Sequence, residues 1–168
     1  MRSTLAVAAL VVLLDQASKW VVLHLIMQPP RLIEITGFFN LTLVYNTGVS
    51  FGLLGGSAPW KPWVLSGVAV VIVVVLLAWL RKQGGTLLLL AGGLVAGGAI
   101  GNVIDRLRLS MVVDFMDFHV AGWHWPAFNV ADSAISVGVV LLVLDGLFPG
   151  RERSKEKQSN GHRGGPAP

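Results

Sequence analysis

Cysteine is absent from this chain of 168 residues, and charged residues are scarce. The absence of cysteine excludes disulfides, thiolate nucleophiles and thiolate metal ligands. Asp, Glu, Lys and Arg together make up 13% of the sequence, whereas soluble domains carry roughly a quarter. Hydrophobic residues make up 54%, and the mean hydropathy is +0.68. The composition therefore indicates a membrane protein, and the length suits one domain.

The formal net charge of +4 does not indicate a nucleic-acid partner. Five basic residues fall in the last eighteen positions: Arg151, Arg153, Lys155, Lys157 and Arg163. Basic residues that flank apolar segments are better interpreted as determinants of membrane topology than as a phosphate-binding surface. We therefore expect no binding to nucleic acid.

Four apolar segments are long enough to cross roughly 30 Å of hydrocarbon as helices. They span residues 4–27, 62–80, 86–104 and 131–148. The third contains Gly93 and Gly97, whose four-residue spacing allows close helix approach, so this segment is expected at the centre of the bundle. The first segment begins like a signal peptide, but ionisable residues interrupt it and the apolar pattern then resumes. We expect an uncleaved first helix.

These segments predict a mainly α membrane fold with four transmembrane helices and a small extracytoplasmic β-rich segment. Residues 1–150 would form a single membrane domain. Residues 151–168 are charged and then rich in Gly and Pro, which is typical of a disordered tail.

The basic residues also predict the orientation. Arg2, the turn at Arg81 and Lys82, and the tail fall on one side of a four-span bundle, so the positive-inside rule places both termini in the cytoplasm. Residues 28–61 and 105–130 would then lie at the outer face.

The outer segments contain patterns typical of strands. In FNLTLVYN, residues 39–46, alternation would place Leu41, Leu43 and Tyr45 on one face. SMVVDFMDFH, residues 110–119, is rich in β-branched and aromatic residues. We expect a small sheet or hairpin on the outer membrane surface.

Several polar residues interrupt the apolar segments or lie close to their ends. Asp15 and Lys19 are four apart and share a helix face, so they can form an ion pair; this pair either supports the fold or binds a ligand. Asn46 and Gly48 suit a turn, although Asn46 could also donate a hydrogen bond to a peptide carbonyl.

Asp105 and Arg106 close the third segment. On a helix their side chains diverge by about 100°, so they need not pair with each other. Arg106 could take part in an ion pair at the helix end, keep a nearby carboxylate ionised, or contact a lipid head group.

Three aspartates lie near the expected sheet. If residues 110–119 are extended, Asp114 and Asp117 point to opposite faces, one to a site and one to water; the pattern does not say which. Asn129 is placed to cap the fourth helix, with Asp132 at its third position. Two aspartates held together share one proton, so that one serves as general base and the other as general acid.

The histidines and serines give weaker indications of a functional site. His119 and His124 belong to no HExxH motif and are expected at the membrane interface, without a metal. Ser50, Ser133 and Ser136 have no recognisable base, so a serine hydrolase is not indicated. We expect neither a metal nor another cofactor.

Five motifs together resemble the bacterial lipoprotein signal peptidases, also called signal peptidase II. They are DQASKW (15–20), YNTGVSFG (45–52), GGAIGNVIDR (97–106), VVDF (112–115) and FNVADS (128–133). They occur in the family's order, and the resemblance covers roughly residues 10 to 146. Each motif is weak alone, but five in register on a four-span frame are specific.

The resemblance implies a multi-pass aspartyl protease of the bacterial inner membrane. Such enzymes cut diacylglyceryl-modified prolipoproteins on the N-terminal side of the lipidated cysteine, near the outer face. The resemblance makes Asp114 and Asp132 the catalytic pair and Asp117 a bystander. It also implies site support from other residues: Asn46, Gly48, Asn102, Arg106, Asn129, Asp15 and Lys19.

The expected partners are the lipid-modified precursor and membrane lipid, and the expected state is a monomer. Two other classes remain as alternatives. A small transporter or channel would use Asp15, Lys19 and the outer aspartates as an ion path and would show flux without proteolysis. A scaffold for membrane assembly would tolerate substitution of Asp114 and Asp132.

Overall fold

Four long helices form the bulk of the protein in a computed structural model, which describes residues 1–48 and 58–148. They are α1 (Arg2–Val21), α2 (Lys61–Leu80), α3 (Thr86–Leu109) and α4 (Val130–Leu147). Each is long and apolar enough to cross a membrane, so the four-span fold is confirmed. The disordered tail predicted for residues 151–168 lies outside the described residues.

The helix α3 lies at the centre of the bundle, as the small residues predicted. In its most apolar stretch 67% of the residues are buried, compared with 17–28% in the other three spans. A side chain at Gly97 would place its Cβ 2.7 Å from the backbone oxygen of Ala8 in α1, and one at Gly93 would approach Thr4 equally closely. These glycines therefore allow α1 to pack directly against the α3 backbone.

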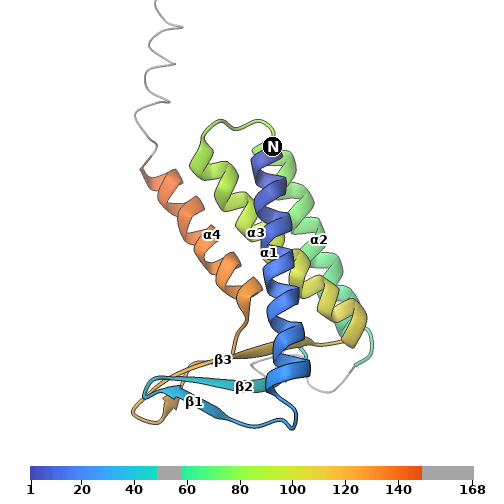
Figure 1. Cartoon of the computed structure of the whole chain (residues 1–168). Helices are drawn as coiled ribbons and strands as arrows, with labels where there is room; N and C mark the ends of the chain where they lie inside the picture. Colours follow the sequence, from blue (N-terminus) through green and yellow to red (C-terminus); the bar gives the residue numbers. More distant parts are fainter. Residues whose placement is uncertain (49–57, 149–168) are drawn as a thin grey trace, which may run out of the picture.

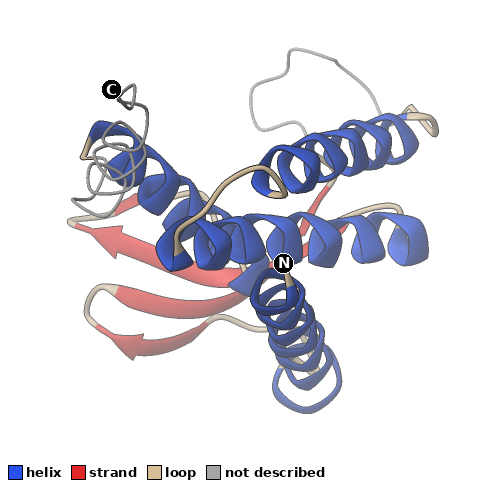
Figure 2. Cartoon of the chain, turned by 90° about the horizontal axis from the view of Figure 1, so that it is seen from above, coloured by secondary structure: helices blue, strands red, loops and turns tan. Residues whose placement is uncertain are grey.

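A four-stranded antiparallel sheet lies at one end of the bundle (Figure 1). Its strands are β1 (Ile33–Thr36), β2 (Phe39–Asn46), β3 (Val112–Val120) and β4 (Trp123–His124), in that order across the sheet. The N-terminus and the α2–α3 turn lie at the opposite end. Seen from above, part of the sheet extends beyond the helices (Figure 2). The predicted small sheet is confirmed.

One buried cluster attaches this sheet to the first helix. A π-helical turn, η1 (Val22–Ile26), continues α1, and Val22 and Met27 pack against Phe115 of β3. Leu41 and Leu43 pack against the same cluster, and Leu43 lines a cavity together with Tyr45. These contacts agree with the prediction that Leu41, Leu43 and Tyr45 share a face.

The pairing between β2 and β3 is irregular in the middle. Leu41 pairs with Met116, but Val44 rather than Leu43 pairs with Asp114. In addition, the carbonyl oxygen of Phe128 accepts hydrogen bonds from two successive β3 amides, Phe115 at 3.1 Å and Met116 at 2.9 Å. Such a bulge interrupts the alternation of side chains.

The close packing of α1 on α3 is testable at Gly97. We expect Gly97→Ala to lower the thermal stability of the detergent-solubilised protein, because overpacking typically costs about 1–3 kcal/mol. The matched control is Gly67→Ala in α2, where an added Cβ meets nothing within 4 Å. Equal melting temperatures for the two variants would contradict this packing.

Candidate active site

Asp114 is held at the centre of a hydrogen-bond network. Its side chain is 1% exposed, and its two carboxylate oxygens accept hydrogen bonds from Asn46 Nδ2 at 2.9 Å and Asn129 Nδ2 at 2.7 Å. Asn46 reaches it because the register shift in β2 brings Val44 opposite Asp114. The end of β2 and the start of α4 therefore each donate one hydrogen bond to the Asp114 carboxylate.

Asp132 lies in a capping box at the start of α4. Asn129 Oδ1 accepts the backbone N–H of Asp132 at 2.9 Å, and Asp132 Oδ2 accepts the backbone N–H of Asn129 at 3.2 Å. The predicted N-cap and third-position roles are thus confirmed. The other carboxylate oxygen, Oδ1, accepts Asn102 Nδ2 from α3 at 2.7 Å.

Two asparagines connect the two aspartates. Asn129 donates to the Asp114 carboxylate while it caps Asp132, and it also donates to Asn102 Oδ1 at 3.2 Å. Asn102 in turn donates to Asp132. The structure therefore brings together the two aspartates that the motifs singled out, along with both asparagines.

The environment of Asp114 changes its affinity for protons. Burial raises the pKa of the Asp114 carboxyl to about 6, although the hydrogen bonds from Asn46 and Asn129 oppose this effect. The negative charge of Asp132 also raises it. Two neighbouring carboxyls, one of them with a raised pKa, are the arrangement in which one can act as acid and the other as base.

Lys19 and Asp15 form the predicted ion pair, with Lys19 Nζ 2.8 Å from Asp15 Oδ2. Lys19 Nζ also lies 2.8 Å from Asp105 Oδ2 and 3.3 Å from Asn102 Oδ1. Asp15 Oδ1 accepts the backbone N–H of Ala131 at 3.0 Å. These contacts favour the structural alternative for the pair, because its polar atoms are occupied by protein groups.

Asp105 and Gln16 complete this network, and the sequence did not assign either to the site. Asp105 Oδ2 accepts the backbone N–H of Val113 at 3.1 Å, next to Asp114. Gln16 Nε2 donates to Asp105 at 2.9 Å and to Asp15 at 3.1 Å. One signal was present: Asp105 lies three residues after Asn102, which places both on one face of a helix.

Asn46 and Gly48 form the predicted turn. Gly48 has φ +87°, and its backbone N–H donates to Asn46 Oδ1 at 2.7 Å. This bond turns the amide nitrogen of Asn46 toward Asp114. The same side-chain amide of Asn46 therefore stabilises the turn through its oxygen and contacts Asp114 through its nitrogen.

Arg106 lies beside the aspartates. Its charge interacts with those of Asp132, Asp105 and Asp114, most strongly with Asp132. Its Nε atom is buried and has no hydrogen-bond partner within the described part of the chain.

Asp117 lies in a separate environment. It is 6% exposed, which corrects the prediction that the second aspartate of the segment faces water. Asn40 Nδ2 lies 3.0 Å and His124 Nδ1 2.9 Å from its carboxylate. Burial alone would raise the pKa of Asp117, but these hydrogen bonds, together with the electrostatic interactions with His124 and His119, outweigh burial, and the pKa is lowered.

The separation of the aspartates in β3 does not come from simple alternation. The bulge at Phe115 and Met116 lies between Asp114 and Asp117, so the argument from alternation does not hold across it. Instead, the partners differ: Asp114 is bonded by Asn46 at the end of β2 and by Asn129 at the start of α4, and Asp117 by Asn40 of β2 and His124 of β4. Among the described residues no group of three or more His, Asp or Glu could hold a metal ion.

Comparison with known proteins decides the family. A family model described as signal peptidase (SPase) II matches residues 7–148. A lipoprotein signal peptidase of Paraburkholderia phytofirmans is 47% identical over 144 residues, covering 85% of this chain and 83% of the relative. One from Burkholderia thailandensis is 45% identical and covers 85% and 86%. The chain belongs to the signal peptidase II family.

Solved structures agree with this assignment. Two structures of a bacterial membrane enzyme, determined by the in meso method at 2.3 Å and 1.9 Å, superpose with a TM-score of 0.76 at 30% identity. They cover 88% of this chain and 88% and 94% of the solved chains. The resemblance drawn from the five motifs is confirmed, and membership of the signal peptidase II family makes the chain a membrane protease.

The double role of Asn129 can be separated by substitution. Serine is as good an N-cap as asparagine, but its short side chain cannot reach Asp114. We expect Asn129→Ser to retain most of the thermal stability and to lose peptidase activity as severely as Asn129→Ala. The alanine variant should also lose the cap, which costs about 0.5–2 kcal/mol. High activity in the serine variant would contradict a role in holding Asp114.

Proposed function

We propose that this protein is an aspartic endopeptidase that removes signal peptides from diacylglyceryl-modified prolipoproteins, cutting on the N-terminal side of the lipidated cysteine. The observation that carries the proposal is the pair of aspartates from β3 and the start of α4, joined through Asn129 and Asn102. The names of the relatives, lipoprotein signal peptidases, support the substrate class.

The chemistry follows from the proton held by the pair. Asp132, as the ionised member, takes a proton from a water molecule whose oxygen attacks the scissile carbonyl carbon. Asp114, as the protonated member, gives its proton to the carbonyl oxygen. When the tetrahedral species collapses, the C–N bond breaks, the amine leaves with the proton from Asp132, and Asp114 regains its own. Such acid–base assistance contributes roughly 10²–10⁴-fold.

The supporting residues have distinct tasks in this scheme. Asn46 and Asn129 orient Asp114, and Asn102 orients Asp132. Arg106, whose Nε has no partner within the described residues, is placed to donate to a substrate carbonyl. We propose no metal or other cofactor.

The membrane orientation belongs to the same proposal. Arg2 and the α2–α3 turn with Arg81 and Lys82 lie at the end of the bundle opposite the sheet (Figure 1). The positive-inside rule then supports cytoplasmic termini and a site at the outer face of the inner membrane. There a single copy of the chain would receive a precursor whose lipid tails lie between the helices.

The transporter alternative gains no support from the buried charges. Lys19 has contacts to Asp15, Asp105 and Asn102, and Asp15 also accepts the amide of Ala131. An ion path would have to break these bonds at each passage. Of the two aspartates of the site, Asp114 lies in β3, outside the spans, and Asp132 lies in the first turn of α4.

Substitution of the aspartates tests the proposal directly. We expect Asp114→Asn and Asp132→Asn each to abolish cleavage of a purified diacylglyceryl-modified precursor, while the protein still inserts and folds. The control is Asp117→Asn, a change in the same strand, which should retain substantial activity. Cleavage by either of the first two variants would rule out the aspartate pair, and equal loss in all three would indicate a structural effect.

The pH profile tests the roles of the two carboxyls. Because the pKa of Asp114 is about 6, raising the pH through this value removes the proton that the acid must donate. We expect kcat/KM for the precursor to fall above about pH 6, approaching about tenfold per pH unit. A profile that is flat from about pH 5 to 8 would contradict this assignment.

A further inference from the structure

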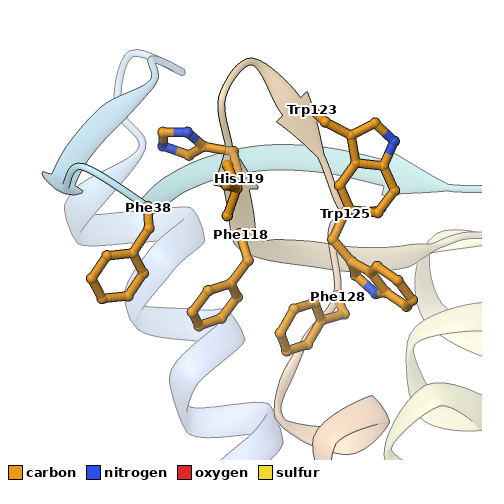
Figure 3. A pocket seen from close by; sticks show the side chains of 7 residues that line it. Phe38, Phe118, His119, Trp123, Trp125 and Phe128 are labelled. Carbon is orange, nitrogen blue, oxygen red and sulfur yellow. The ribbon is translucent and has the colours of Figure 1, made fainter.

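Aromatic side chains gather at the part of the sheet that extends beyond the bundle. They surround a cavity of about 450 Å³, here called the aromatic cavity. Its apolar lining consists of Phe38, Phe118, Val120, Trp123, Trp125 and Phe128. Figure 3 shows the rings of Phe38, Phe118 and Phe128 pointing to the side of the sheet on which the helices lie. Phe118 stacks on Phe128 with centroids 5.8 Å apart.

The lining is too exposed to be a protein core. Phe38 is 55%, Trp123 62% and Val120 71% exposed within the described residues. A contiguous apolar surface of this kind normally marks a site of interaction with another protein, a ligand or a membrane.

The opposite face of the same strands is polar. Phe39 pairs with Phe118, and their rings lie 4.8 Å apart. The next pair, Asn40 and Asp117, is hydrogen-bonded on the other face, and Glu34 pairs with Asn40. The tip of the sheet therefore has one apolar face, which is directed toward the helices, and one polar face.

The length of α4 places the aromatic cavity at a definite depth. α4 has 18 residues, which corresponds to about 27 Å and nearly fills a hydrocarbon core of about 30 Å. The helix begins at Val130, and Phe128 lies two residues before it. When α4 spans the hydrocarbon core, this places the cavity wall formed by Phe128 next to the boundary between the acyl chains and the head groups.

We infer that the aromatic cavity is seated in the lipid interface and takes a phospholipid at the level of its glycerol and ester groups. Tryptophan suits this level because its ring is apolar and its N–H can donate a hydrogen bond. Because β3 carries both Phe118 and Asp114, seating the cavity fixes the height of Asp114 relative to the bilayer. The inference concerns membrane seating and does not depend on proteolysis.

The absence of cysteine makes a direct depth measurement possible. Single-cysteine variants Phe38→Cys and Val120→Cys place a nitroxide label in the cavity lining, and Glu34→Cys places one on the polar face as the matched control. The full-length proteins are reconstituted into vesicles of phosphatidylethanolamine and phosphatidylglycerol. Collision rates of each label with oxygen, which concentrates in lipid, and with a water-soluble nickel chelate report its depth.

We expect oxygen collisions to dominate at Phe38→Cys and Val120→Cys and nickel collisions to dominate at Glu34→Cys. Two positions in the lining are labelled so that, if one variant does not fold, the other still reports the depth of the cavity. If both lining labels collide with nickel as often as the control label does, the surface faces water and the inference is wrong. If they are shielded from both reagents, another protein copy covers the cavity, and the inference is equally wrong.

Discussion

The geometry of the site depends on one buried ammonium group. Lys19 Nζ lies 2.8 Å from carboxylate oxygens of both Asp15 and Asp105. Asp15 also accepts the amide of Ala131 in α4, and Asp105 accepts the amide of Val113 in β3. A single cation thus joins α1, α3, α4 and β3. Removing one partner of such a buried pair costs roughly 3–5 kcal/mol, because a charge is left uncompensated.

The two amides fixed in this way directly precede the two aspartates of the site. Val113 precedes Asp114, and Ala131 precedes Asp132. The ionic cluster therefore positions both carboxylates through their own backbones, and asparagines then orient the side chains. The charges within the spans thus have a structural explanation. The position that this cluster gives Asp114 is buried in the protein, and this burial raises the pKa of its carboxyl.

The sequence predicted the features that depend on local interactions. It did not predict the contacts that depend on how distant segments pack together. The four spans, the first-helix ion pair and the capping box of α4 each follow from spacings of a few residues, and the structure confirms them. The contact of Asp105 with Lys19 depends on how α3 packs against α1, which no local pattern contains. The bulge in β3 depends on the carbonyl of Phe128, which belongs to another segment. Alternation along β3 therefore gave the wrong reason for separating its aspartates, and only the five-motif resemblance chose between them.

The central claim is that Asp114 and Asp132 share one proton. Isotope-edited infrared spectroscopy of protein labelled with ¹³C-aspartate detects protonated carboxyl groups directly. The account predicts one protonated aspartate that titrates near pH 6 and whose signal is missing from the Asp114→Asn variant. If both aspartates remain ionised down to their ordinary range of about pH 4, the proton is not shared and the proposed acid–base chemistry is contradicted.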